Sequence, residues 1–523
     1  MPQQKSERRV VPAARRKAGE TGRLEASRGG KAASVEEATR QLALWFGTAD
    51  NRRAPARRAI AGAEAGPPAP APRVAPKPKH KDRTASSTWM DEVCKKLGDA
   101  FQNVASNKGA PGPDHQPIAE VRAHLGEILE ELTASLTAGT YQPGDVRRVW
   151  IPKAGGGQRG LGIPNVIDRV VQEAVRLVLE PVYEPTFHAS SHGFRPGRSC
   201  HTAIAEAKGY LEEGYEYVVD LDLKEFFNRV HHQRLMARLA QRVHDKPLLE
   251  LIGRMLKAKV VLPEGGVVCT DEGVPQGGPL SPLLSNIVLD ELDWMLAERG
   301  HRFVRYADDS NIYVRSERAG QRVMASVTRF LEGRMRLEVN QAKSAVAKPE
   351  DRHFLGFSLR HGPLEGDVEV LLSKRSKERI GARLRELTPR NWGQSFDTML
   401  LQLNAYLLGW LGYFGVCTAG QEMGFHSLDA HIRRRLRAVL LKQWKRKRFI
   451  VRNLITLKVK PKTAWRNVFE QRKSLWALSH APAVHQGLRN AYFAERGLMS
   501  IVGRWKLAAR SVDVPRQLRL ALG

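Results

Sequence analysis

The chain has 523 residues and a formal net charge of +29, from 84 Lys and Arg against 55 Asp and Glu. This length exceeds what one ordinary hydrophobic core needs, so we expect two to four structural units. The charge indicates a polyanionic partner, and nucleic acid is the simplest one because we expect neither a secretory signal nor a membrane span. The four cysteines are widely separated, which excludes a CxxC pair or a zinc cluster and suits a reduced, cytoplasmic setting.

The N-terminal residues 1–85 are rich in Ala, Arg, Pro, Gly and Lys, and this composition predicts a basic, disordered extension. Within it, only residues 35–46 have apolar residues near helical spacing. We expect ordered sequence to begin near Trp89. Between Ile118 and Leu136 the apolar residues recur every three and four positions, which predicts one amphipathic helix.

Strand patterns begin at Val146, where "RRVWIPK" and "QRGLGIP" flank a glycine-rich stretch and predict a hairpin. A helix is expected over residues 167–179. The β-branched run "YVVDLDL" predicts a buried strand, and "HRFVRYADDSNIYV" predicts two short strands around an acidic turn. The last third is helical, and its apolar stretch at residues 396–417 is interrupted by polar residues and glycines, so we expect a packed helix there. The fold class expected is therefore α+β, followed by an all-α extension.

Carboxylates lie at the ends of these expected strands. Asp222 is in the first strand segment, and Asp308 with Asp309 forms the acidic turn. Carboxylate oxygens are the ligands that Mg²⁺ prefers, and two such ions catalyse nucleotidyl transfer. An Asp-Asp pair in a turn is weak evidence by itself, because Asp also stabilises turns. The companion motifs decide the interpretation.

Over residues 89–523 the sequence resembles the group II intron reverse transcriptase and maturase family. The resemblance is carried in order by "RRVWIPKAGGGQRGLGIP", "SHGFRPGRSCHTAI", "DLDLKEFFNRV", "GVPQGGPLSPLLSNIVLDELD", "YADD" and "FLGF". It implies a right-hand polymerase with fingers and palm over residues 86–371. It further implies a helical thumb, called domain X, over residues 372–448, and a helical, basic DNA-binding region over residues 449–523.

The resemblance also assigns roles near the acidic turn. Lys153 and Arg159 match positions that hold the incoming triphosphate, and Gln276 matches one near the nascent base pair. Phe227 matches the aromatic residue that excludes a 2′-hydroxyl and so favours dNTPs, whereas Phe226 suits the core. Lys343 matches a general acid that protonates the departing pyrophosphate.

Asp222 has a rival as metal ligand in Asp220, two residues earlier on the same face of the strand, but only Asp222 has the aromatic residue at the family's spacing. Template phosphates are the expected partners of Arg195 and Arg198. The aromatic residues Trp465, Trp476, His480 and Trp505 are candidates for contacts with bases or sugars, with burial in the core as the alternative.

One helix of the last third has apolar residues on a single stripe and basic residues largely outside it. The apolar stripe comprises Leu428, Ile432, Leu436, Val439 and Leu440. The expected nucleic-acid-binding side chains are Arg433, Arg434, Arg437, Lys442 and Lys445.

These expectations describe an RNA-directed DNA polymerase that uses two Mg²⁺ ions and dNTPs to copy an RNA template from a DNA primer. The resemblance adds group II intron RNA and target DNA as partners, with splicing and retrohoming as the biological roles. No module resembling the family's homing endonuclease is recognised. A bacterial, cytoplasmic protein that joins the nucleoid during mobility is expected. A splicing-only maturase and a domesticated reverse transcriptase in host defence or DNA repair remain open.

Overall fold

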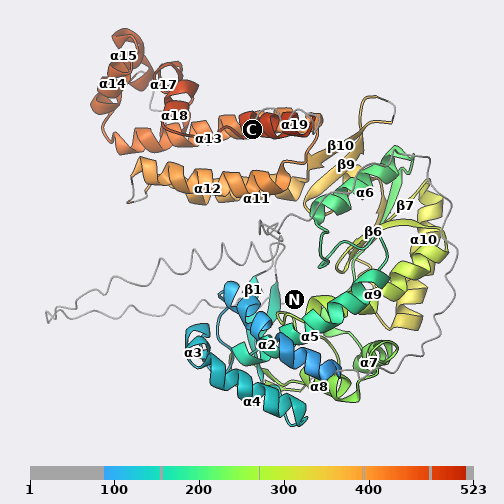
Figure 1. Cartoon of the computed structure of the whole chain (residues 1–523). Helices are drawn as coiled ribbons and strands as arrows, with labels where there is room; N and C mark the ends of the chain where they lie inside the picture. Colours follow the sequence, from blue (N-terminus) through green and yellow to red (C-terminus); the bar gives the residue numbers. More distant parts are fainter. Residues whose placement is uncertain are drawn as a thin grey trace, which may run out of the picture. The chain divides into compact units, whose positions relative to one another are not determined.

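A computed structural model of the chain describes residues 88–152, 157–269, 271–364, 366–391, 393, 395–469 and 474–513 (Figure 1). All of them belong to one compact unit, residues 69–523. Two sequence-based expectations, the short helix at residues 35–46 and the position of Lys153, lie outside the described residues.

The described part is an α+β body followed by helices, as the sequence predicts. Its N-terminal helices are α2 (Trp89–Ser106), α3 (Ile118–Ala123), α4 (Leu125–Thr137), α5 (Val166–Tyr183), α6 (Cys200–Glu212), α7 (His232–Ala240), α8 (Lys246–Leu256), α9 (Ser281–Glu298) and α10 (Glu317–Phe330). The later helices are α11 (Lys374–Leu387), α12 (Phe396–Phe414), α13 (Glu422–Gln443), α14 (Lys447–Thr456), α15 (Pro461–Phe469), α16 (Leu475–Leu478), α17 (Pro482–Gly487), α18 (Asn490–Glu495) and α19 (Ile501–Asp513).

The single helix predicted over residues 118–136 is wrong in one respect, because the chain forms two helices there. His124, which lies between α3 and α4, has φ −113° and ψ 25°, outside the helical region. The apolar spacing continues across this break, with Val121, Leu132 and Leu136 all buried, so the pattern alone does not reveal it.

The strands form three sheets. Their bounds are β1 (Val146–Pro152), β2 (Gln158–Ile163), β3 (Tyr217–Leu221), β4 (Val260–Val261), β5 (Val267–Val268), β6 (Arg302–Tyr306), β7 (Asp309–Val314), β8 (Ala345–Ala347), β9 (Phe357–His361) and β10 (Val368–Leu372). The first sheet has the order β2-β1-β4-β5 and contains the predicted β1–β2 hairpin. The second has the order β6-β7-β3-β8, and β9 pairs with β10 in the third.

The second sheet carries the predicted acidic strands. Neighbouring strands within this sheet are all antiparallel, and β3 lies between β7 and β8. Val218, Val219 and Leu221 of β3 are buried, as the β-branched run predicts. The sheet therefore brings the end of β3 beside the start of β7, where Leu221 pairs with Ser310.

Two hydrophobic cores hold these elements. The first joins α2, α4, α5 and α7 to α10 with one side of the second sheet. The second joins α6, β9 and β10 to the helices from α11 to α19. A fully buried Leu or Phe contributes roughly 1.5 to 3 kcal/mol, so each core is large enough to fix its elements.

The apolar helix expected at residues 396–417 is α12, which packs Leu403 and Leu407 into the second core. Among the described helices, none combines the length and the apolar character that a membrane crossing demands.

Candidate active site

The acidic turn predicted from the sequence is a tight hairpin between β6 and β7. Tyr306 pairs with Asp309, and Ala307 and Asp308 form the turn between them. Ala307 has φ +58°, a conformation that costs an L-residue roughly 1 kcal/mol. Gly193 lies against this turn, since a Cβ there would come within 2.2 Å of the Ala307 nitrogen. The turn is therefore held in a demanding conformation by its surroundings.

Asp222 follows the last residue of β3 and is fixed through its backbone. Its N–H donates to Ser344 Oγ at 3.0 Å, and its carbonyl accepts from Asn340 N at 2.8 Å. The segment from Asn340 to Ser344 thus fixes the backbone of Asp222, from which its carboxylate projects. That carboxylate forms an ion pair with Lys343 Nζ at 3.0 Å.

The three predicted carboxylates affect one another's titration. Close packing of protein raises the pKa of Asp309 to about 7, and the neighbouring carboxylates of Asp308, Asp220 and Asp222 add to this rise. The Asp309 side chain is nevertheless open to solvent on one side, which tempers the effect. Burial likewise raises the pKa of Asp308, while nearby Arg159 opposes the rise.

This donor set suits a hard divalent cation, because several carboxylates share one end of a sheet and are destabilised by each other. Asp308 and Asp309 both interact electrostatically with Asp222. Within the residues that the structure describes, no group of three His, Cys, Asp or Glu side chains is already gathered closely enough to enclose a metal ion.

Asp220, the rival ligand, has a different partner. Arg352 Nε donates to Asp220 Oδ2 at 2.8 Å, and the two side chains form an ion pair. Arg352 also donates to the carbonyl of Lys343. Asp220 is therefore bound to an arginine, whereas Asp222 pairs with a lysine whose side chain is 68% exposed.

Of the residues expected to bind the nucleotide, Arg159, Phe227 and Gln276 lie in the part of the chain that the structure describes. Arg159 on β2 interacts with Asp308, and β2 also contacts the segment that contains Gln276, whose carbonyl accepts from Gly162 N at 2.6 Å. A Cβ at Gly277 would lie 2.2 Å from the Gly162 carbonyl oxygen, so glycine is required for this approach. Gly277 therefore allows a close contact between the β1–β2 hairpin and the segment before α9.

Phe226 and Phe227 separate as expected. Phe226 is buried in the first core, while Phe227 is only partly buried. The Phe227 carbonyl accepts from Val274 N at 2.7 Å, which connects it to the chain just before Gln276.

Arg195 and Arg198, the expected template contacts, lie in different settings. Arg195 is 9% exposed, and its guanidinium forms an ion pair with Glu184 at 2.8 Å and donates to the carbonyl of Ser191 at 2.8 Å. These contacts argue against the predicted phosphate contact for Arg195, because its donors point into the protein. Arg198 is partly exposed and donates to the carbonyl of Ala189.

The five basic residues of the C-terminal helical region also differ from one another. Lys442 and Lys445 are exposed, as the stripe pattern predicts. Arg433 and Arg434 are partly exposed, and the Arg434 guanidinium lies 4.2 Å from the centre of the Trp476 ring. Arg437 is buried and donates to the Leu488 carbonyl at 2.9 Å, and burial with nearby Arg433 lowers its pKa to about 10. The expectation that Arg437 binds nucleic acid is not supported, because it packs between helices.

The aromatic candidates divide in the same way. Trp505 is buried and donates to the Cys417 carbonyl at 3.0 Å, so its role is structural. Trp465 is 46% exposed and stacks on Phe469 at 4.7 Å. Trp476 lies beneath Arg434, and His480 is exposed.

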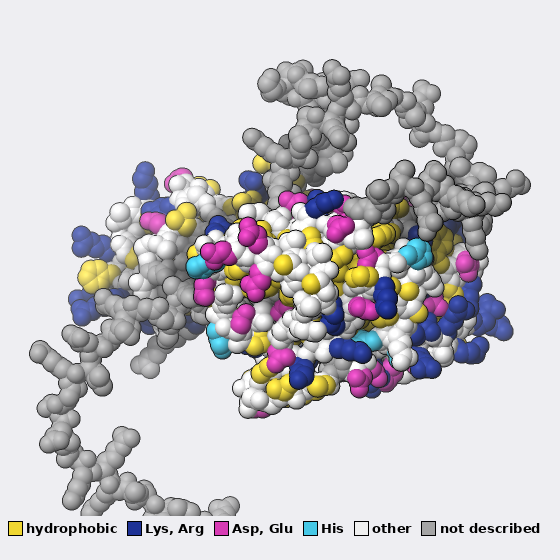
Figure 2. Space-filling view, turned by 60° about the horizontal axis from the view of Figure 1, so that its bottom comes forward, with side chains coloured by type: hydrophobic (Ala, Val, Ile, Leu, Met, Phe, Trp, Pro, Cys, Tyr) yellow, Lys and Arg dark blue, Asp and Glu magenta, His cyan; other side chains and the backbone are white. Residues whose placement is uncertain are grey.

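Lys and Arg side chains are unevenly spread over the surface. On the face drawn in Figure 2, they gather toward both sides of the view, while Asp and Glu are mixed with other residues nearer its middle. Between Lys442 and Phe469 the chain has ten Lys and Arg and no Asp or Glu. This concentration marks the α13–α15 region as a candidate polyanion surface.

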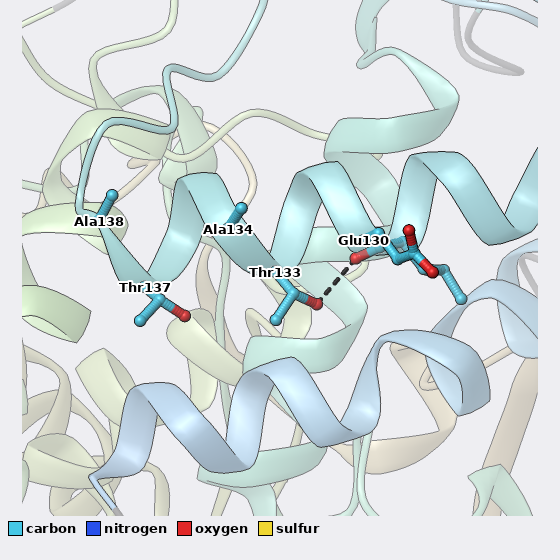
Figure 3. Close-up of a pocket in the computed structure, with 6 residues that line it drawn as sticks. Glu130, Thr133, Ala134, Thr137 and Ala138 are labelled. Carbon is cyan, nitrogen blue, oxygen red and sulfur yellow. Dashed lines mark hydrogen bonds between the residues drawn. The ribbon is translucent and has the colours of Figure 1, made fainter.

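The hollow drawn in Figure 3 lies along α4 and has none of the predicted site residues in its lining. Its lining is Leu129, Glu130, Thr133, Ala134 and Thr137 of α4, and Ala138, which follows the helix. The Thr133 hydroxyl is already bonded to the Leu129 carbonyl at 2.7 Å. The hollow lacks the converging polar groups that a substrate site needs.

The sequence did not reveal a buried cluster below the acidic turn. Arg305 has no exposed surface and forms an ion pair with the equally buried Asp293 of α9. The available signal was a charged residue within the apolar strand "RFVRY" and another within the apolar helix α9. Such isolated charges in buried elements require partners.

Comparison with known proteins identifies two regions. Residues 151–359 match the reverse transcriptase (RNA-dependent DNA polymerase) family, and residues 377–456 match the group II intron maturase-specific domain. The chain is 35% identical over 317 residues to protein YkfC of Escherichia coli, a match that covers 53% of this chain and 83% of YkfC.

Two further similarities are more partial. The group II intron-encoded protein LtrA of Lactococcus lactis is 41% identical over 209 residues, which span 39% of this chain and 34% of LtrA. The chain therefore matches about a third of LtrA's length. A telomerase structure from Candida albicans aligns with 75% of this chain and 69% of its own, at 14% identity and a TM-score of 0.43, below the level that shows a shared fold.

Proposed function

Because the chain belongs to the group II intron reverse transcriptase and maturase family, we propose that it copies RNA into DNA by two-metal nucleotidyl transfer. The observation that carries the proposal is the convergence of Asp222 with Asp308 of the acidic turn and Asp309 at the start of β7, at one end of the second sheet. Their mutual repulsion is relieved by divalent cations, for which carboxylates are suitable ligands.

In this proposal Asp222, Asp308 and Asp309 hold two Mg²⁺ ions. When bound, the ions would activate the 3′-hydroxyl of a DNA primer and stabilise the pyrophosphate that leaves from a dNTP. Lys343, which now pairs with Asp222, is exposed enough to move toward that pyrophosphate and donate a proton.

The remaining residues would select and orient the dNTP. Arg159, beside Asp308, supplies positive charge for the triphosphate, together with Lys153 by the family resemblance. Phe227, which is partly exposed and follows Asp222 by five residues, would collide with the 2′-hydroxyl of an rNTP and so disfavour rNTPs. Gln276 would lie near the nascent base pair, on a segment whose position β2 fixes.

Group II intron RNA, an RNA template and target DNA are the proposed polyanionic partners, with splicing and retrohoming as the roles. Support comes from the exposed Lys442 and Lys445 and from the stacked, exposed pair Trp465 and Phe469, over which Lys447 adds a cation at 5.4 Å. Cationic side chains beside exposed aromatic rings suit phosphates and unpaired bases. The match to the maturase-specific domain favours intron RNA as one of these partners.

The proposal is tested by primer extension on an RNA template with dNTPs and Mg²⁺. Asp308→Ala should lower the extension rate by about a thousandfold or more, since it removes charge from the reacting centre. RNA affinity should change less than about twofold, because a single acidic residue makes no phosphate contact. Asp99→Ala, an acidic side chain exposed on α2, serves as the control. Retention of extension by Asp308→Ala would exclude the proposed site.

A further inference from the structure

The guanidinium of Arg305 is the most completely bonded side chain near the acidic turn. Its side chain is fully buried, and each of its five N–H donors has an acceptor. Nε donates to Asp293 Oδ1 at 2.7 Å, and Nη2 donates to Asp293 Oδ2 at 2.5 Å and to Ser191 Oγ at 2.7 Å. Nη1 donates to Asn286 Oδ1 and to the Ala307 carbonyl, both at 2.9 Å.

These acceptors belong to three separate elements. Asn286 and Asp293 are on α9, which begins five residues after Gln276, and Ser191 is in the loop before α6. The Ala307 carbonyl belongs to the turn that carries Asp308. One side chain therefore connects the acidic turn to the helix that follows the nucleotide-side segment.

The backbone of Arg305 strengthens the same junction. Its N–H donates to the Ser190 carbonyl at 2.9 Å, and its carbonyl accepts from His192 N at 2.8 Å. Asn286 adds a further link, because its Nδ2 donates to the carbonyl of Gly193 at 2.9 Å. Gly193 is the residue that lies against the Ala307 nitrogen.

The turn needs such support. Ala307 has a positive φ, which is unfavourable for an L-residue with a side chain, so the local sequence does not favour this conformation. A hydrogen bond from a charged donor is stronger than one between neutral groups, so the bond from Arg305 can offset that cost. The Nη1 bond to the Ala307 carbonyl therefore fixes the peptide from which Asp308 projects.

Arginine is required by the geometry and not only by charge. A lysine could neutralise Asp293, but its ammonium has three donors and no planar fork. It could not reach Asp293, Asn286, Ser191 and the Ala307 carbonyl together. A lysine at position 305 would therefore keep the positive charge beside Asp293 but would lose part of the hydrogen-bond set that includes the Ala307 carbonyl.

We propose that Arg305 is a positioning residue for the metal-binding carboxylates, holding the Ala307–Asp308 turn against α9 so that Asp308 and Asp309 meet Asp222. This inference rests on the proposed function, because it assigns the carboxylates to metal binding. It adds a residue that acts through the turn and touches neither metal nor nucleotide.

The test compares Arg305→Lys with Arg176→Lys in the full chain. Arg176 is an arginine of α5 that is 23% exposed and pairs with Glu173 and Glu180, with no contact to the turn, so it is a matched control. Mn²⁺ binding is measured by electron paramagnetic resonance, thermal unfolding by circular dichroism, and primer extension as a function of Mg²⁺ and dNTP concentration.

Arg305→Lys should weaken Mn²⁺ binding tenfold to a hundredfold, the range typical of residues that orient metal ligands. The Mg²⁺ concentration needed for half-maximal extension should rise by a similar factor, whereas the KM for dNTP should change less than threefold. Arg176→Lys should leave Mn²⁺ affinity unchanged even if its unfolding temperature falls equally. Wild-type Mn²⁺ affinity in folded Arg305→Lys, or an equal loss in Arg176→Lys, would overturn the inference.

If Arg305→Lys does not fold, Asn286→Ala provides the measurement. It removes one acceptor of Nη1 and the link to Gly193 while the Arg305–Asp293 pair remains. It should weaken Mn²⁺ binding threefold to tenfold, and unchanged affinity would contradict the inference. A failure of the proposed function is recognised separately, because wild-type protein would then fail to extend primers whatever the Mn²⁺ affinities are.

Discussion

Replacing Arg195 by Ala distinguishes a structural arginine from one that binds a template phosphate. The substitution removes an ion pair with Glu184 and three hydrogen bonds to backbone carbonyls, those of His188, Ser191 and Glu184. Breaking a buried pair by deleting one partner costs about 3 to 5 kcal/mol. The Glu184 side chain is 26% exposed and regains part of its hydration, so we expect the lower end, about 3 kcal/mol.

This loss is a large fraction of the 5 to 15 kcal/mol by which folded domains are typically stable. Urea unfolding followed by circular dichroism should show a lower midpoint for Arg195→Ala. Glu184→Gln should shift the midpoint in the same direction, and the double variant Arg195→Met, Glu184→Leu should recover much of the loss, because no charge is then left unpaired.

RNA affinity should be measured below the unfolding transition across a range of salt concentrations. A structural arginine leaves the slope of log affinity against log salt unchanged, whereas the loss of one phosphate contact reduces it by about one. If Arg195→Ala unfolds like the wild type but has a shallower salt slope and weaker RNA binding, the structural interpretation is wrong.

Two further substitutions test other contacts. Tyr413→Phe removes the hydroxyl that donates to the Leu355 carbonyl at 2.8 Å in the "FLGF" turn, which the family resemblance assigns to support of the primer end. The KM for primer-template should therefore rise about two- to tenfold, while the KM for dNTP stays constant in steady-state extension assays. Asp290→Asn tests a carboxylate that is 13% exposed and whose pKa is raised to about 6 by partial burial and by Asp293. Because the pKa is raised on folding, the contribution of protonated Asp290 to the free energy of unfolding is fully present below about pH 4. It is lost as the pH rises through 6. The variant should therefore gain stability over the wild type from pH 4 to 7, by up to roughly 3 kcal/mol less the lost pair with Arg238, and a difference in thermal midpoint that does not depend on pH would contradict this.

The strands that carry the acidic residues were predictable because their runs of apolar, β-branched residues coincide with the positions that are buried in the sheet. In β3, Val218, Val219 and Leu221 face the interior, and the run ends at Asp222, where the strand ends. A turn between the two strands was equally predictable, since the apolar pattern stops and restarts there, but it comprises Ala307 and Asp308, and Asp309 already belongs to β7.

Burial of basic residues was not predictable from the same patterns. Helical spacing assigns Arg437 to the polar side of α13, but α17 and the chain after it cover that side, where Arg437 Nε donates a hydrogen bond to the Leu488 carbonyl. Arg195 sits in a loop, where no periodicity exists to report burial. In both cases the deciding contact comes from residues far along the chain or in irregular structure, and a single sequence does not show which elements meet.

The choice between Asp220 and Asp222 illustrates what structure adds to a motif. Both lie on the same face at the end of β3, so their spacing alone does not separate them. Asp220 is 20% exposed and accepts a hydrogen bond from Arg352, which also donates to the Lys343 carbonyl. Breaking the pair between Asp220 and Arg352 would therefore leave a half-buried arginine without its carboxylate partner. Asp222 faces only the ammonium of Lys343, and exposed pairs of this kind contribute little to stability. A divalent cation can therefore displace Lys343 from Asp222 at small cost, and that displacement would also free the lysine for the pyrophosphate. The different cost of breaking the two pairs favours Asp222 as the ligand, on physical grounds that are independent of the family resemblance.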